Sequence, residues 1–428
     1  MDTIFALASA PGKSGIAIVR ISGESAFGVV EKITGNLTRV RYAGLRKFKS
    51  SSGLTIDHGL VVCFEGPQSF TGENVVELHL HGSPAVVTSI FRLLGSFSGL
   101  RYAEPGEFTR RALENGKLDL AQVEGLADLI EAETEAQRSQ AVRVLSGDIG
   151  DKAGIWRTDL TRACALLEAS IDFADEDVPE DVTPEVIDLI DKTLESLVVE
   201  VAGAQIAERV RTGFEIAIVG APNVGKSSLL NRLAGRDAAI TSEIAGTTRD
   251  VIEVKMDLDG LPVTFLDTAG LRSTSDAVEN IGISKALKRA ALADLTLLIT
   301  EDGRVPSQAL LRKDDLVVLS KADLTGREGA ISTVTGQGID QLVGDVTSIL
   351  SRRSATIGVV TRERHRLALI KAIKSLEDAQ EKIRLCSINL ELIAEDIRRS
   401  VVSLDSLIGR VDLESVLDEI FSRFCLGK

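Results

Sequence analysis

The segment with the clearest chemical meaning is Gly220-Ala-Pro-Asn-Val-Gly-Lys-Ser227, which fits the pattern G-x-x-x-x-G-K-[ST]. An apolar run at 215–219 predicts a strand before it, and residues 228–234 predict a helix after it. Glycines let backbone N–H groups approach phosphates, and a helix N-terminus attracts anions. We expect Lys226 to reach the β- and γ-phosphates and Ser227 to bind Mg²⁺. The predicted phosphate contacts are Asn223, Val224, Gly225, Lys226, Ser227 and Ser228.

Two later segments complete the phosphate side. The Thr-bearing stretch 241–250 is typical of a switch segment, with Thr248 as the second hydroxyl ligand of Mg²⁺. A strand predicted at 262–266 ends in Asp267, which is expected to support Mg²⁺ and to sense the γ-phosphate. The nucleotide contacts predicted here are Ser242, Thr247, Thr248, Asp267, Thr268, Ala269 and Gly270.

A third strand, predicted at 316–320, leads into Lys321-Ala-Asp323. A carboxylate here accepts two hydrogen bonds from guanine, which adenine does not offer. Ser320 replaces the usual Asn, so one amide contact to the base is lost. We expect guanine-side contacts from Lys321, Asp323, Ser332 and Thr333. The four motifs in this order indicate a GTPase rather than an ATPase.

Two departures from the Ras-like pattern bear on mechanism. Leu271 stands where Ras-like enzymes have a glutamine that orients the attacking water. The sequence also shows no obvious arginine finger; Arg249 and Arg272 are the candidates, but their position relative to the phosphates cannot be derived from the sequence. Asn223 either stabilises the loop or holds a monovalent cation through its side-chain oxygen. A potassium ion there would supply the positive charge that an arginine finger otherwise provides.

Composition limits the classes of function. The chain of 428 residues is 44% hydrophobic and carries a formal net charge of −14, which argues against broad attachment to RNA phosphates. An RNA function therefore needs a local basic patch or a partner with a positive surface. Neither the four cysteines nor the four histidines are spaced as a metal site, and we interpret His79 and His81 as structural. No targeting segment or long apolar run is found, which predicts a soluble cytoplasmic protein.

Hydrophobic periodicity divides the chain into four parts. Residues 1–118 mix strands and helices, and 119–210 show helical spacing, including Leu126 and Leu129. Residues 211–355 alternate strands with helices and contain the nucleotide motifs. Residues 356–428 return to helical spacing, with Leu367, Ile370, Ile373, Leu376 and Ile383.

Several further motifs resemble one family, the tRNA-modification GTPase MnmE (TrmE) family, over nearly the whole chain. The most specific is the tail Phe424-Cys-Leu-Gly-Lys428, with Leu426 where the family usually has Ile. The others lie at 2–12, 18–23, 69–73, 77–82, 105–111 and 115–122. The resemblance implies an N-terminal α+β domain that binds folate and dimerises. It also implies a helical domain built from two chain segments and a Ras-like P-loop GTPase domain inserted between them.

The resemblance also assigns roles to residues. Glu279, Lys226 and Cys425 match catalytic positions, with Glu279 helping to orient the attacking water. Potassium ligands match Asn223, Ser242, Ile244 and Thr247. Folate contacts match Arg20, Glu77, Lys117 and Lys428. Taken without the resemblance, these charges are ordinary surface groups and Cys425 is an incidental thiol.

The function implied is potassium-dependent GTP hydrolysis by a homodimer that modifies the wobble uridine of tRNA. The family partner is the FAD-dependent protein MnmG, with which a heterotetramer is expected, and the carbon donor is 5-formyl- or 5,10-methylene-tetrahydrofolate. Mg²⁺ and K⁺ accompany GTP. An alternative is a GTPase switch in ribosome assembly, although such proteins usually carry basic appendages. A folate-metabolic enzyme with a vestigial nucleotide site is disfavoured because the nucleotide motifs are nearly complete.

Overall fold

The computed structural model describes residues 2–172, 181–221, 223–236, 239–240, 253–267, 291–305, 311–354, 358–385, 390–410, 421 and 427. The chain forms two compact units. Unit 1 comprises Met1–Ala127 together with Asp405–Lys428, and unit 2 comprises Asp128–Leu404. Among the described residues, no helix has the length and apolar character needed to cross a membrane.

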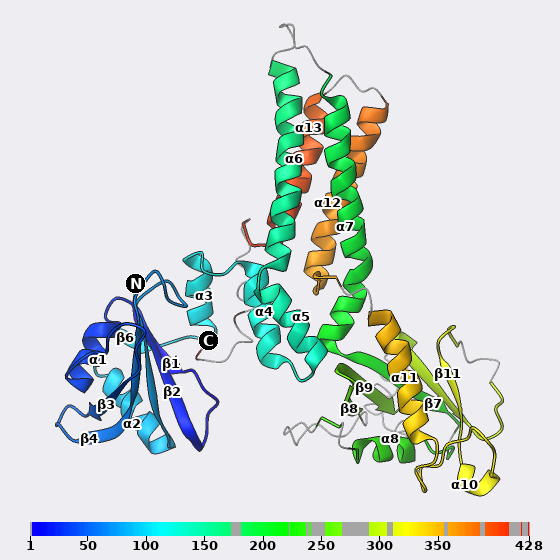
Figure 1. Cartoon of the computed structure of the whole chain (residues 1–428), viewed down its shortest axis with the longest axis horizontal. Helices are drawn as coiled ribbons and strands as arrows, with labels where there is room; N and C mark the ends of the chain where they lie inside the picture. The colour runs from blue at the N-terminus through cyan, green and yellow to red at the C-terminus, as the bar shows by residue number, and fades with distance from the viewer. Residues whose placement is uncertain are drawn as a thin grey trace, which may run out of the picture. The chain divides into compact units, whose positions relative to one another are not determined.

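Unit 1 is built on a six-stranded sheet of order β3-β4-β5-β2-β1-β6 (Figure 1). Neighbouring strands are antiparallel except β1 and β6, which are parallel. The strands are β1 (Thr3–Leu7), β2 (Ser14–Ser22), β3 (Gly44–Lys49), β4 (Thr55–Phe64), β5 (Val75–Gly82) and β6 (Leu100–Tyr102). The helices are α1 (Ala26–Thr34), α2 (Pro84–Leu94), α3 (Glu107–Glu114) and α4 (Leu120–Glu131), whose last residues belong to unit 2.

The two faces of this sheet differ because side chains alternate along a strand. Helices α1 and α2 pack on one face, over a core that includes Phe5, Val19, Ile21, Leu78 and Ile90. The intervening positions point to the other face. Arg20 on β2 is therefore the cross-strand partner of Glu77 on β5. A smaller cluster of Ile4, Ala6, Ala103 and Phe108 lies on this second face.

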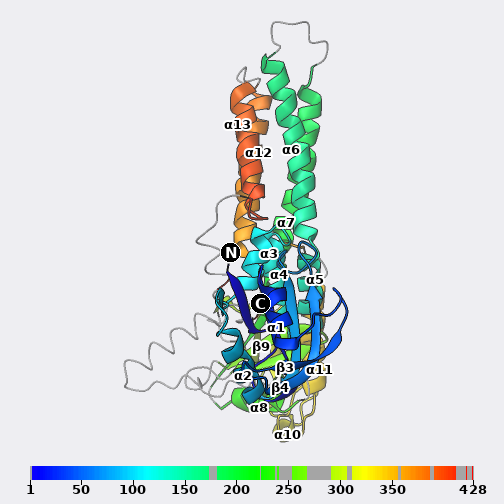
Figure 2. The ribbon, with the colours of Figure 1, turned by 90° about the vertical axis from the view of Figure 1, so that its left-hand side faces the viewer.

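Unit 2 contains a bundle of four long helices that run side by side in both ribbon views (Figures 1 and 2). They are α6 (Asp148–Asp172), α7 (Thr183–Thr212), α12 (Glu363–Arg384) and α13 (Leu390–Asp405). Contacts across the bundle include the Cys164 thiol with the carbonyl of Ala394, at 3.7 Å, and an ion pair between Lys382 and Asp396. The shorter α5 (Glu135–Leu145) precedes α6. Two segments distant in sequence thus form one helical domain.

Between α7 and α12 the chain forms an α/β domain with a sheet of order β11-β10-β7-β9-β8. Only β8 is antiparallel to its neighbour. The strands are β7 (Phe214–Gly220), β8 (Glu253–Leu258), β9 (Leu261–Asp267), β10 (Leu295–Thr300) and β11 (Leu316–Leu319). The helices are α8 (Lys226–Ala234), α10 (Ala322–Thr325) and α11 (Ile339–Arg353). The predicted fold, an α+β domain, a two-segment helical domain and an inserted P-loop domain, is confirmed.

Candidate functional site

The predicted phosphate loop connects β7 to α8 and has the backbone that its glycines permit. Gly225 has φ +106°, a conformation that side chains disfavour, and it directly precedes the first residue of α8. Gly220 ends β7, where a Cβ would overlap the carbonyl oxygen of Ile299. Asn223 is exposed at φ +63°, whereas Val224 is buried and anchors the loop. The loop therefore surrounds the N-terminus of α8 with backbone groups.

Lys226 lies over this loop. Its Nζ donates hydrogen bonds to the carbonyl oxygens of Gly220 and Ala221, at 2.7 and 2.6 Å. Burial lowers the pKa of Lys226, and the nearby Asp267 carboxylate opposes that shift. The ammonium group is thus held at the loop by backbone oxygens.

Ser227 and Asp267 meet at the carboxyl edge of the sheet. The strands β7 and β9 are parallel neighbours with Ile218 opposite Asp267, so both strands end at the same edge. The Ser227 hydroxyl donates to Oδ2 of Asp267 at 2.6 Å, and Asp267 is only 1% exposed. A hydroxyl beside a carboxylate provides the hard oxygen donors that Mg²⁺ prefers. These residues fit the magnesium site that the motifs predict.

The guanine-side residues gather beyond the end of β11. Ser332 is fully buried and donates to Oδ1 of Asp323 at 2.7 Å, which fixes the orientation of that carboxylate. Two backbone bonds join the loops that carry them, from Ile331 N to Leu319 O at 2.7 Å and from Ala322 N to Ile331 O at 3.0 Å.

The remaining predicted nucleotide contacts differ in their exposure. Lys321 adopts φ +59°, Ser320 is buried and Thr333 is half-buried. Ser228, on the first turn of α8, is exposed.

Other predicted site residues lie outside the part of the chain that the structure describes. They are Ser242, Ile244, Thr247, Thr248, Thr268, Ala269, Gly270, Glu279, Cys425 and Lys428, and the mechanistic candidates Arg249, Leu271 and Arg272.

A second cluster of predicted site residues lies on the face of the unit 1 sheet opposite to α1 and α2. Arg20 forms an ion pair with Glu77 through Nε and Nη2, at 3.1 and 2.9 Å from the same oxygen. The guanidinium carbon lies 5.2 Å from the ring centre of Phe70 and 5.8 Å from that of Phe108. Aromatic faces attract cations, so both rings hold the charged end of Arg20 in place. His79 Nε2 lies 3.5 Å from the second oxygen of Glu77.

Lys117 approaches this region from the end of α3. Its Cε lies 3.3 Å from the position that a Cβ on Gly72 would take, so this glycine, at φ +80°, makes room for the lysine. Asn115 donates to the carbonyl oxygen of Thr71 at 2.7 Å and fixes the same turn. The structure thus brings Lys117 close to the 69–73 motif.

A buried ion network that residue types alone did not reveal supports this cluster. Arg111 contacts Glu73 at 3.0 Å and Glu107 at 2.9 Å, and Arg101 also binds Glu107, at 2.6 Å. Burial tends to raise the pKa of Glu107, but hydrogen bonds from Arg101, the Glu104 backbone and Arg111 outweigh it, and the pKa falls to about 2. The network ties the 69–73 motif to the 105–111 motif. In the sequence, the motif resemblance marked Glu73, Glu107 and Arg111 without giving them a role, and nothing marked Arg101.

The C-terminal segment also belongs to unit 1. Gly427 is buried, and its carbonyl oxygen lies 3.5 Å from Nη1 of Arg20. Phe421 is 1% exposed and packs against Gly106 and Val123, with the Arg110 guanidinium 5.0 Å from its ring centre. Two described residues of the tail are therefore packed within the N-terminal unit.

Two family models match the N-terminal domain and the rest of the chain. The family model described as MnmE helical domain matches residues 120–425, and the one described as GTP-binding protein TrmE N-terminus matches residues 3–117. The chain is 59% identical to tRNA modification GTPase MnmE of Dinoroseobacter shibae and 58% identical to that of Cereibacter sphaeroides, over 100% of each chain. An Aquifex aeolicus Era structure bound to GDP·AlF4− is 26% identical, with a TM-score of 0.25, over 38% of this chain and 66% of its own. The chain belongs to the MnmE family of tRNA modification GTPases.

Proposed function

We propose that this protein is a potassium-dependent GTP hydrolase that modifies C5 of the wobble uridine in certain tRNAs. With the FAD-dependent partner MnmG, it would install a carboxymethylaminomethyl or aminomethyl group, using a one-carbon unit from 5-formyl- or 5,10-methylene-tetrahydrofolate. The observation that carries the proposal is the ion pair of Arg20 and Glu77, whose arginine also lies 3.5 Å from the carbonyl oxygen of Gly427. Two candidate folate contacts are therefore close to a residue of the C-terminal motif.

The nucleotide half of the mechanism rests on the loop, Ser227 and Asp267. Lys226 would exchange its two carbonyl partners for the β- and γ-phosphates, while Ser227 and Thr248 would bind Mg²⁺. When bound, Mg²⁺ neutralises charge that develops on the phosphates. Asp323, oriented by Ser332, would accept hydrogen bonds from guanine.

Potassium would occupy a place beside the phosphates, with Asn223, Ser242, Ile244 and Thr247 as its ligands. The exposed, left-handed Asn223 has a side chain free of the hydrophobic core, which suits this role. Glu279 would then orient the attacking water in place of the missing glutamine. A monovalent cation and a positioned water together account for hydrolysis without an arginine finger.

The folate half rests on charge. Glu77 would accept hydrogen bonds from the donor edge of the pterin, with Arg20 holding that carboxylate in place. Lys117 and Lys428 would bind the anionic glutamate tail. The acceptor capacity of Glu77 is only partly used, because both Arg20 bonds fall on Oε1. Cys425 would act on the substrate carried by this site.

We assign the folate and dimerisation domain to residues 1–118, the helical domain to 119–210 and 356–428, and the GTPase domain to 211–355. The protein would act in the cytoplasm as a homodimer whose GTPase domains pair when GTP and potassium are bound. Because the GTPase domain is joined by two short connections, its pairing would be transmitted to the helical bundle.

Nucleoside mass spectrometry tests the proposal. Transfer RNA from a strain lacking the protein would be compared after complementation with the wild type, with Cys425→Ser and with Cys164→Ser. Cys164 is a matched control because it is buried in the bundle, and burial raises its pKa to about 11. The wild type and Cys164→Ser should restore the modified wobble uridine, and Cys425→Ser should not. Unchanged tRNA in the deletion strain would refute the proposal.

A further inference from the structure

One part of unit 1 has a charge opposite to that of the whole chain. From Lys32 to Ile56, both included, there are six cationic residues and no Asp or Glu, in a chain with a formal net charge of −14. Five of them lie in the turn at 39–42 and in strand β3, and we call this segment the basic edge: Arg39, Arg41, Arg46, Lys47 and Lys49.

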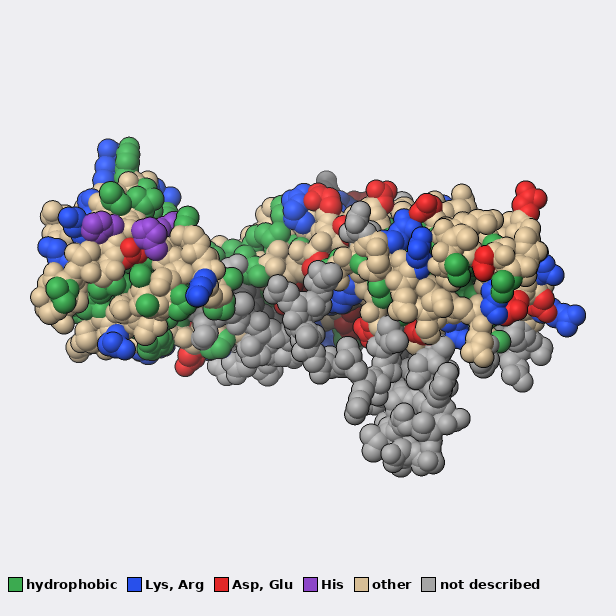
Figure 3. Space-filling model, turned by 90° about the horizontal axis from the view of Figure 1, so that it is seen from below, with side chains coloured by type: hydrophobic (Ala, Val, Ile, Leu, Met, Phe, Trp, Pro, Cys, Tyr) green, Lys and Arg blue, Asp and Glu red, His purple; other side chains and the backbone are tan. Residues whose placement is uncertain are grey.

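The basic edge lies at the border of the sheet. Strand β3 is the terminal strand and pairs on one side only, with β4. Lys47 and Lys49 are exposed, and neither is in an ion pair within the described residues. In Figure 3 the left-hand part of the molecule, which is unit 1, shows mostly Lys and Arg side chains among its charged groups, whereas Asp and Glu are more frequent to the right. These lysines are therefore available to an anionic partner.

The turn adds an aromatic ring to these charges. The Arg39 guanidinium lies 4.6 Å from the ring centre of Tyr42, one of only two tyrosines in the chain. The Tyr42 side chain is 56% exposed. Arg41 adopts φ +63°, an unfavourable conformation for a side chain of this size, and its guanidinium donates to the carbonyl oxygen of Gln68. An exposed ring stacked on a guanidinium is a surface on which nucleobases also stack.

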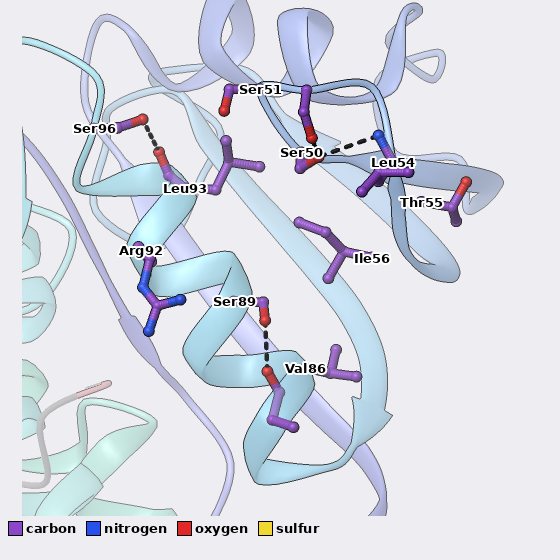
Figure 4. A pocket seen from close by; sticks show the side chains of 12 residues that line it. Ser50, Ser51, Leu54, Thr55, Ile56, Val86, Ser89, Arg92, Leu93 and Ser96 are labelled. Atoms are coloured by element: carbon purple, nitrogen blue, oxygen red, sulfur yellow. Dashed lines mark hydrogen bonds between the residues drawn. The ribbon is translucent and has the colours of Figure 1, made fainter.

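A pocket of about 600 Å³ begins where β3 ends, between the β3–β4 turn and α2 (Figure 4). Its lining includes six hydroxyl side chains and the guanidinium of Arg92, but no carboxylate. The hydroxyls of Ser89 and Ser96 donate to helix carbonyl oxygens at 2.8 and 2.7 Å, so they present lone pairs to the pocket. Acceptors of this kind suit sugar hydroxyls, and Arg92 suits a phosphate.

We propose that the basic edge and this pocket bind the sugar-phosphate backbone of tRNA. The proposal rests on the proposed function, for which it supplies the positive surface that the overall charge lacks. Its chemistry matches that of RNA, with cations spaced about 7 Å apart along one side of a strand, an exposed aromatic ring and a hydroxyl-rich pocket. A competing role exists, because lysines on an edge strand also prevent pairing between sheets of different molecules.

Binding of unmodified tRNA to the full-length, GDP-bound protein tests the proposal. Fluorescence anisotropy over a series of KCl concentrations would compare the wild type, Lys47→Ala/Lys49→Ala and the control Lys371→Ala/Lys374→Ala, which removes two exposed lysines from α12. We expect the basic-edge variant to bind about tenfold more weakly at low salt. The slope of log K against log salt should fall by between about 1 and 2, because two phosphate contacts are lost. The control should match the wild type, and GTP hydrolysis without tRNA should be unchanged in all three.

Equal affinity and equal slope for the basic-edge variant would overturn the proposal. Aggregation of that variant with unchanged tRNA affinity would also overturn it, and would show that the lysines protect the edge strand instead. Complementation separates this failure from that of the proposed function. If the variant keeps its tRNA affinity and restores the wobble modification, the surface assignment is wrong while the function stands. If the wild type does not restore the modification, the proposed function itself fails.

Discussion

Arg20 and Glu77 form an ion pair in which both nitrogen donors share one carboxylate oxygen, at 3.1 and 2.9 Å. The third nitrogen of the guanidinium, Nη1, lies 3.5 Å from the carbonyl oxygen of Gly427. A single arginine thus contacts both the sheet and the C-terminal segment. This relationship connects the candidate folate contacts to the tail, which lies more than four hundred residues away in sequence.

Replacing Arg20 with alanine should weaken the binding of 5-formyltetrahydrofolate. The variant leaves Glu77 without the arginine that holds its carboxylate, so we expect a loss of about 2 kcal/mol or more, roughly 30-fold in Kd. Isothermal titration calorimetry measures this. The control Arg143→Ala removes an exposed arginine from α5 and should bind as the wild type does. Equal affinities for all three proteins would remove Arg20 from the site.

Substitution of Gly427 should uncouple modification from hydrolysis. A Cβ at this position would overlap the carbonyl oxygen of Leu7, so Gly427→Ala must displace the tail from β1. We expect tRNA modification in cells to be largely lost while the purified variant retains its kcat for GTP. Gly344→Ala is the matched control, because a Cβ there meets no atom within 4 Å. Full modification by the Gly427 variant would show that tail docking is dispensable.

Asp267→Asn should slow GTP hydrolysis strongly. The substitution removes the negative charge beside Ser227, where Mg²⁺ is proposed to bind, and losses of about 10²–10³ in kcat are usual when a group that stabilises the transition state is removed. Single-turnover hydrolysis measures the effect, and binding of fluorescent GDP checks that the loop remains folded. Asp345→Asn, on the exposed side of α11, should hydrolyse GTP at the wild-type rate.

Exchanging potassium for sodium at constant ionic strength should reduce GTP turnover at least about tenfold, because the smaller ion fits the potassium ligands poorly. Asn223→Ala should abolish the difference between the two ions while GDP still binds. Steady-state phosphate release measures both. A wild-type rate that is the same in sodium and potassium would contradict the cation mechanism.

Glu107 should make the stability of unit 1 depend on pH. Its pKa is about 2 in the folded protein and 4.5 as its ordinary value, so the folded state binds fewer protons. The stabilisation, about 3 kcal/mol, is therefore complete above pH 4.5 and is lost as the pH falls towards 2. Hydrogen exchange of peptides from β1, β6 and α3 should show that Glu107→Gln loses protection at pH 7 but differs little from the wild type near pH 2. Glu363→Gln removes an exposed carboxylate and should have no such effect.

The sequence by itself predicted where the segments of the nucleotide site lie within the P-loop domain. The phosphate loop, the strand-end aspartate and the predicted guanine-side segment are each contiguous, and each follows an apolar run that forms the predicted strand. Parallel strands place such segments at one edge of the sheet, so order along the chain was enough to bring Ser227 to Asp267. The helical segments were also predicted correctly, since helical spacing is a local signal.

Tertiary structure alone decided which helix faces are buried and which charges meet. On α12, Leu367 and Ile370 are exposed, and the buried side instead carries Ala368, Leu369, Ala372, Leu376 and Ala379. Helix α12 packs against α7, and small buried alanines permit helices to approach closely, although hydrophobicity scales give alanine little weight. The ion pair between Arg111 and Glu73 and the contact of Arg20 with Gly427 join residues that lie 38 and 407 positions apart in sequence. Such contacts depend on the register of the sheet and on where the tail packs, and no local pattern encodes either.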